Sequence, residues 1–161
     1  MSIKISGLCG AFMLLTFVSF SQTKTFQGAW FEVKYPTDFK AKGSLASETS
    51  DGFDSAIFTS PDGTVSFYVY SPQWSGDARD IGIQPNEELT STRADNTDSK
   101  SVEWWTIVAN DQTYTRSYQK TTDMASNTMS VIGVKHKNQA SYDRYKKQYI
   151  AFKSSLKQFA D

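Results

Sequence analysis

Carboxylate side chains that occur in pairs are the first candidates in this sequence for catalysis or metal binding. Two acids with separated pKa values can act as general acid and base on a glycoside, and clustered carboxylate oxygens can bind calcium. No stretch has the acid, glycine and distal glutamate spacing of a calcium loop. We therefore predict solvated turn residues and no metal site, since Asp in polar loops commonly hydrogen-bonds its own backbone. The pairs are Asp51 and Asp54, Asp77 and Asp80, Glu87 and Glu88, and Asp95 and Asp98.

A second candidate for catalysis is His136, the single histidine, which lies between Lys135 and Lys137. In a serine hydrolase this residue would have to be the base, but no serine lies in a nucleophile elbow. Zinc sites normally recruit two or three His or Cys ligands, and the only cysteine is Cys9. Phosphate-binding glycine loops and dinucleotide fingerprints are absent from the sequence. We expect no catalytic residue and no cofactor; the alternative is a secreted hydrolase that uses carboxylate or His136 chemistry.

Aromatic and large aliphatic residues offer a candidate binding surface instead. The segment 71–85 has neither strand nor helix periodicity, and long irregular connections in compact domains are usually functional or mobile. Large apolar groups on such a loop either fold back onto the core or contact a partner. Trp74 is thus either a lid on the core or an anchor for a partner, and the tyrosines before it either belong to the core or line the surface. The candidate binding residues are Trp74, Ile81, Ile83, Tyr68 and Tyr70.

Length and charge limit the kind of protein. The chain has 161 residues, which is enough for one domain with a short appendage. Lys and Arg number 17 and so do Asp and Glu, so a nucleic-acid binder that relies on a general basic field is excluded. The partner expected from the sequence is an unknown protein or envelope component.

The appendage is residues 1–21. Lys4 supplies a positive start, the run from Gly7 to Val18 has the length of a secretory core, and Ser19-Phe20-Ser21 resembles a cleavage site. We predict a signal peptide cleaved before Gln22, a single domain at 22–161, and a periplasmic or extracellular protein with no stable membrane span after cleavage. Residues 22–161 contain no cysteine, so this domain forms no internal disulfide.

The remaining sequence predicts an antiparallel sheet. Runs of alternating apolar and polar residues indicate strands, and Pro61-Asp62-Gly63 is typical of a hairpin turn. On the strand after this turn, Val65, Phe67 and Val69 share one face. For residues 71–99 we predict a loop that includes a short strand or helical turn at 87–93. The predicted strands are 30–35, 53–60, 64–70, 102–109, 113–120 and 128–137.

Two further patterns describe what covers the sheet. Trp104 and Trp105 are consecutive strand residues and so point to opposite faces, which indicates a strand covered on both sides. Near the C-terminus, apolar residues recur at helical spacing and predict a helix packed on the sheet, with Asn138 or Ser141 as its cap. That stripe is formed by Tyr142, Tyr145, Tyr149, Phe152, Leu156 and Phe159.

The order of short motifs resembles the PsbP-like family, which includes photosystem II extrinsic proteins and secreted bacterial relatives. The motifs are FEVKYPTDF at 31–39, FTSPDGTVSF at 58–67, TYTRSY at 113–118 and FKSSL at 152–156. The resemblance implies an α+β fold with a central antiparallel β-sheet and a C-terminal helix, an α/β/α sandwich of PsbP-like type. It also implies a non-enzymatic binding or assembly module. The segment 71–99 lacks the helix that many relatives place there.

Overall fold

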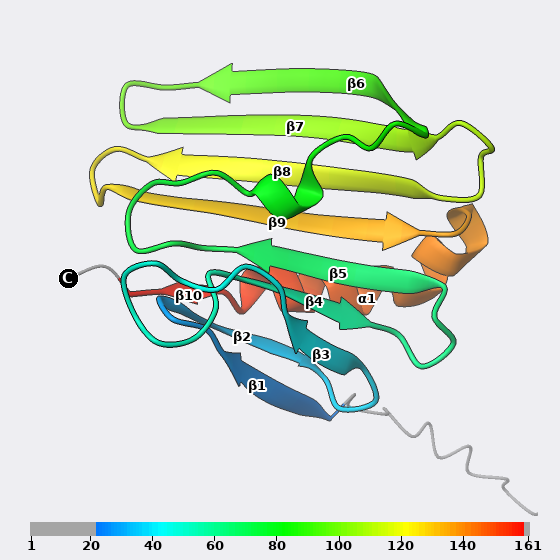
Figure 1. Ribbon diagram of the computed structural model, residues 1–161, viewed down its shortest axis with the longest axis horizontal. Helices are drawn as coiled ribbons and strands as arrows, with labels where there is room; N and C mark the ends of the chain where they lie inside the picture. The colour runs from blue at the N-terminus through cyan, green and yellow to red at the C-terminus, as the bar shows by residue number, and fades with distance from the viewer. Residues whose placement is uncertain (1–21, 160–161) are drawn as a thin grey trace, which may run out of the picture.

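The computed structural model describes residues 22–159 (Figure 1). The predicted signal peptide at 1–21 lies outside the described residues. The elements are β1 (Thr23–Gln27), β2 (Phe31–Pro36), β3 (Lys40–Gly43), β4 (Ser55–Thr59), β5 (Val65–Tyr70), the short 3-10 helix η1 (Arg79–Ile81), β6 (Glu87–Asn96), β7 (Lys100–Ala109), β8 (Thr115–Asp123), β9 (Thr128–His136), α1 (Gln139–Ser154) and β10 (Lys157–Gln158).

The main sheet is antiparallel and has seven strands in the order β3-β4-β5-β9-β8-β7-β6. The predicted hairpin joins β4 to β5, and Gly63 has the φ of 68° that its turn requires. The predicted meander is confirmed as β7-β8-β9. In the assembled sheet β9 lies between β5 and β8, so that residues 65–70 contact residues 131–136. A smaller sheet of order β1-β2-β10 lies beside it.

One face of the main sheet is covered by α1 and the small sheet, as predicted for the C-terminal helix (Figure 1). The Asn138 side chain caps α1 by accepting a hydrogen bond of 2.9 Å from the Ser141 N–H. Phe152 is fully buried and its ring lies 5.1 Å from Phe58 and 5.2 Å from Phe67. The helix ends at Ser154, so the prediction that Leu156 and Phe159 continue its stripe is wrong. Within residues 22–159, no helix is long and apolar enough to cross a membrane.

The opposite face is covered by residues 71–86, which we call the strap (Figure 1). The predicted fold class, α+β with a central antiparallel sheet and a C-terminal helix packed on it, is confirmed. The strap's only helical part among the described residues is the three-residue η1, so the second layer expected for the sandwich is an irregular segment here. The fold is α+β, with one α-helix packed on one face of the sheet. Pro72, Gly76, Gly82 and Pro85 interrupt the strap, and such residues disfavour a regular helix.

Within the loop predicted for 71–99, the short strand expected at 87–93 is confirmed, but it is longer than predicted, because β6 runs for ten residues to Asn96. β6 is the edge strand of the main sheet, and its side chains from Glu88 to Asn96 are all exposed. An exposed edge strand needs no apolar face. The alternation that identifies half-buried strands is therefore missing from its sequence.

The two tryptophans of β7 lie on opposite faces, as their consecutive positions predict. Trp105 lies on the strap face and stacks on Tyr118, with ring centroids 5.4 Å apart. Trp104 lies on the other face, where its Nε1 donates to Gln119 at 3.1 Å and the Arg93 guanidinium lies 4.9 Å from its ring. Only Trp105 packs against a core cluster.

Candidate binding groove

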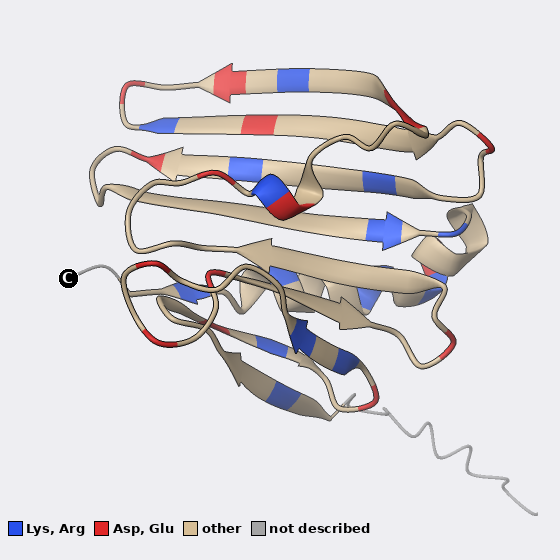
Figure 2. Cartoon of the chain, viewed as in Figure 1, with Lys and Arg blue, Asp and Glu red and all other residues tan. Residues whose placement is uncertain are grey.

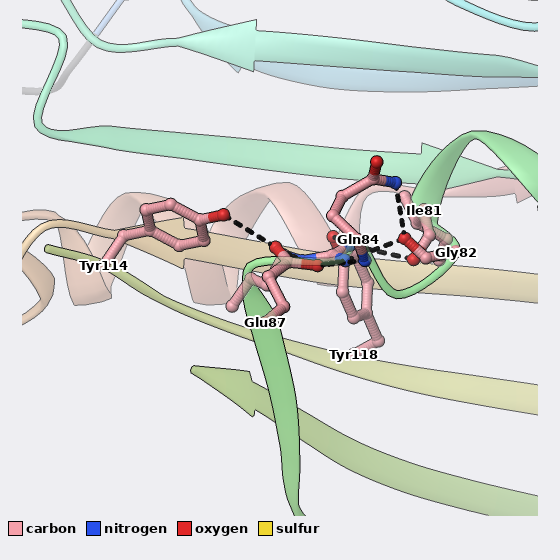
Figure 3. A network of polar contacts seen from close by, with 7 residues as sticks. Ile81, Gly82, Gln84, Glu87, Tyr114 and Tyr118 are labelled. Atoms are coloured by element: carbon pink, nitrogen blue, oxygen red, sulfur yellow. Dashed lines mark hydrogen bonds and ion pairs between the residues drawn. The ribbon is translucent and has the colours of Figure 1, made fainter. Parts of the chain in front are cut away.

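A buried ion pair attaches the strap to the sheet (Figure 3). Arg116 of β8 and Glu87, at the start of β6, have side chains that are 7% and 2% exposed. Arg116 donates from Nε to Glu87 Oε1 at 2.8 Å and from Nη2 to Glu87 Oε2. It also donates to the strap carbonyls of Ile81 at 2.8 Å and Gly82 at 2.9 Å, and to the Tyr118 hydroxyl at 3.0 Å. All five N–H groups of the guanidinium are thereby used, which leaves none for a ligand.

Glu87 is the acceptor at the centre of this network. Its carboxylate also accepts from the Tyr114 hydroxyl and from the Gln84 backbone N–H, both at 2.8 Å. Burial alone raises the pKa of Glu87, but these donors and Arg116 outweigh it and lower the pKa to about 2. Glu87 is therefore ionised at neutral pH, and its carboxylate bonds Gln84 of the strap as well as Arg116 of β8.

A second attachment comes from Asp80 in η1. Its two carboxylate oxygens accept from the Tyr68 hydroxyl and from Ser55 Oγ, each at 2.7 Å. Burial, followed by the adjacent Asp80 carboxylate, raises the pKa of Tyr68, so its hydroxyl stays protonated and donates. The prediction that the paired carboxylates are solvated turn residues is thus wrong for Glu87 and Asp80. Both bond residues more than ten positions away in the chain.

The attached strap forms one wall of a groove of about 650 Å³. The floor is the strap face of β7, β8 and β9, and the rim is formed by Ile83 of the strap and Leu89 of β6, which are 53% and 43% exposed. An ion pair between Glu103 and Lys120, at 3.8 Å, also lines the groove. The apolar floor is formed by Trp105, Ile107, Met129 and Val131.

The five candidate residues from the sequence do not form one surface. Ile81 and Ile83 line the groove, Tyr70 and Trp74 line a cavity of about 230 Å³, and Tyr68 lines a third cavity, of about 380 Å³, beside Arg116. Tyr68, Tyr70 and Ile81 are 4%, 4% and 8% exposed and belong to the core cluster under the strap. Trp74 is 46% exposed, so of the five only Trp74 and Ile83 are accessible.

Sequence reasoning missed Trp105, Met129 and Leu89 as lining residues. Nothing local identifies them, because their shared position follows from the pairing of β6 to β9 and from the strap above. The sequence indicates only on which face of the sheet the Trp105 side chain lies, because successive strand residues alternate in direction. It does not indicate which segment packs on that face.

The groups proposed for hydrolase chemistry lie far apart. His136 pairs with Val65 at one end of β5, whereas Asp54 precedes Ser55, which pairs with Tyr70 at the other end. Six strand residues separate these ends by roughly 16 Å. The His136 ring bonds its own loop, with Nδ1 3.1 Å from the Asn138 carbonyl, and burial lowers its pKa.

Asp54 is half-buried and its Oδ1 has no hydrogen-bond partner in the described chain, and burial raises its pKa. Asp51, the carboxylate paired with Asp54 in the hydrolase alternative, is exposed. Within residues 22–159, no group of three or more His, Cys, Asp or Glu residues is arranged to hold a metal ion.

Comparison with known proteins identifies the fold. No family model matches the sequence, and no curated protein matches it either. Among solved structures, cyanobacterial PsbP (CyanoP) from Synechocystis sp. PCC 6803 matches with a TM-score of 0.50 and 14% identity, over 95% of this chain and 98% of that one. The Saccharomyces cerevisiae Ran-binding protein Mog1p matches with a TM-score of 0.46 and 9% identity, over 87% and 97%. The resemblance read from the motifs is confirmed at the level of fold: the chain has a PsbP-like fold.

Proposed function

We propose that this PsbP-like domain is a non-enzymatic binding module that holds an apolar segment of a partner protein in the groove beneath the strap. The observation that carries the proposal is the exposed pair Ile83 and Leu89 on the rim of a groove with an apolar floor. Ligand sites are commonly concave and mostly apolar, with a few polar groups that fix orientation. The Glu103–Lys120 pair supplies such polar groups here.

The groove is formed before a partner binds, because the strap is fixed by polar contacts that do not depend on a ligand. Arg116 bonds the strap carbonyls of Ile81 and Gly82, and Asp80 bonds Tyr68 and Ser55. A pre-ordered wall reduces the entropy lost on binding, which favours recognition by a small surface. A binding role is also what a PsbP-like fold suggests.

The test places a photo-crosslinking amino acid at Ile83 and, as a matched control, at Ile150. Both isoleucines are just over half exposed, but Ile150 lies on α1, on the far side of the sheet. In the native envelope we expect a specific crosslinked product from position 83 alone, and its loss when Leu89→Asp is added. Equal products from both positions, or none from position 83, would contradict the proposal.

The enzymatic alternative has a separate test. Purified protein is assayed on generic esterase, phosphatase and glycosidase substrates, together with His136→Ala and the double variant Asp51→Asn and Asp54→Asn. We expect no turnover that depends on these residues. Activity abolished by either variant would contradict a non-enzymatic role.

We also propose that the protein acts in the periplasm or outside the cell. Support comes from the signal-like pattern of residues 1–21, and from the start of β1 at Thr23, since cleavage before Gln22 would leave this strand whole. Intact-mass measurement after expression in a Gram-negative host is expected to give a chain that begins at Gln22. Recovery of the full-length chain from the membrane fraction would contradict this.

A further inference from the structure

β6 presents an open strand edge. It pairs with β7 alone, and half of the backbone N–H and C=O groups of an edge strand point away from its neighbour. A register shift interrupts β6 between Leu89 and Ser91, but the stretch from Ser91 to Asn96 pairs regularly with β7. This regular half extends beyond α1 and the strap, so neither covers it (Figure 1).

The open half of β6 carries charged residues of both signs (Figure 2). Arg93 and Asp95 are two residues apart and therefore point to the same side. Within residues 22–159, neither forms an ion pair. The Arg93 guanidinium lies over the Trp104 ring, which places it on the face opposite to the strap.

We propose that β6 pairs antiparallel with β6 of a second copy of this chain, with Ala94 on the two-fold axis. Arg93 then lies opposite Asp95 of the second copy, and the symmetry makes this ion pair twice. Thr92 lies opposite Asn96 on the other face, and Ala94 lies opposite its own copy. No bulky side chain meets another at the axis.

The register follows from faces and charges. Directly opposed residues of an antiparallel pair share a face, so the numbers of paired residues must add to an even sum. An axis at Arg93 or Asp95 opposes like charges, which is destabilising, and an axis at Thr92 opposes Arg93 to Ser91. Of the axes from Thr92 to Asp95, only the one at Ala94 opposes unlike charges.

The pairing would join two seven-stranded sheets and bring two grooves together. Ala94, on the axis, and Thr92, beside it, line the groove on the strap face, so the groove of one copy continues into that of the other. One strand edge buries less than the roughly 1,600 Å² of a standard interface, so the dimer forms at high protein concentration. The proposal does not depend on what occupies the groove.

A charge-swap experiment tests the register. Sedimentation velocity of the purified protein is measured over roughly a hundredfold range of concentration, because dimerisation follows mass action. We expect Arg93→Asp or Asp95→Arg alone to weaken the dimer about tenfold or more, because each opposes like charges. The double variant carrying both changes should restore it. The double variant also lacks the Arg93–Trp104 contact, so its recovery would show that the loss acts between copies.

A disulfide measurement tests the axis. Opposed Cα atoms in antiparallel strands are about 4.5–5.5 Å apart, within the range for a disulfide. In a chain with Cys9→Ser, we expect Ala94→Cys to give a covalent dimer under mild oxidation, and Thr92→Cys, whose copies lie four residues out of register, to give little. Monomer at every concentration, equal dimerisation of single and double charge variants, or equal oxidation at 92 and 94 would each overturn the proposal. So would a monomer whose β6 instead binds an extended segment of another protein.

Discussion

Replacing Glu87 with Gln is expected to cost about 3–5 kcal/mol of the free energy of unfolding, the usual result of leaving one charge of a buried pair without its partner. Arg116 would keep its charge at a side chain only 7% exposed. The amide also presents an N–H where the carboxylate accepts, so it cannot replace all four hydrogen bonds that Glu87 accepts from Arg116, Tyr114 and Gln84. For a domain of this size the change corresponds to a fall in Tm of roughly 10–15 °C.

Denaturant unfolding and calorimetry measure this loss directly, with Glu48→Gln as the matched control. Glu48 pairs with Arg79 at 3.5 Å, but these side chains are 80% and 66% exposed. Exposed ion pairs contribute about 0–1 kcal/mol, so the control should stay close to wild type. Amide hydrogen exchange is expected to rise at Ile81 and Gly82 in Glu87→Gln alone, because their carbonyls lose a fixed Arg116.

The loss also depends on pH in a direction that the structure determines. The pKa of Glu87 is lowered from 4.5 to about 2, so on acidification the unfolded chain takes up the proton first. The stability that Glu87 contributes is complete above pH 4.5 and is lost between about 4.5 and 2. The gap between wild type and Glu87→Gln should therefore narrow through this window. A gap below 1 kcal/mol at neutral pH, or one that widens on acidification, would refute the assignment of a buried, strap-holding ion pair.

Three other variants have definite expected outcomes. Phe152→Ala should cost about 3–5 kcal/mol of the free energy of unfolding, because it leaves a cavity beside the Phe58 and Phe67 rings. Ile150→Ala, at a residue 54% exposed, should cost little, and equal denaturant midpoints for the two variants would contradict this packing. Gly133→Ala should reduce the free energy of unfolding by about 1–3 kcal/mol and so lower Tm, because the new Cβ would overlap the Tyr118 ring. An unchanged Tm would show that the ring moves freely. Trp74→Ala should change stability by less than Phe152→Ala, because Trp74 is 46% exposed; a loss as large would make it a lid on the core.

Local patterns in the sequence determined the parts of the fold that short segments specify. The alternation in β5 assigns Val65, Phe67 and Val69 to the helix face, since successive strand residues point to opposite sides. Spacing of three and four residues predicted α1, and polar residues near its start predicted a cap at Asn138 or Ser141, of which the structure has Asn138. These features depend only on neighbours along the chain, so they could be read without a structure.

Tertiary structure alone decided what covers the second face and what holds it there. Glu87 and Arg116 are 29 residues apart and meet only because β6, β7 and β8 are adjacent strands. Without knowledge of the strand pairing, Glu87 is a glutamate next to another glutamate in a polar segment. Such a segment is typical of a solvated turn. The groove follows in the same way, since the residues that line it together with Trp105 come from the strap, β6, β8 and β9. A side chain's burial and its charge partner depend on contacts between distant segments, and periodicity carries no information about those contacts.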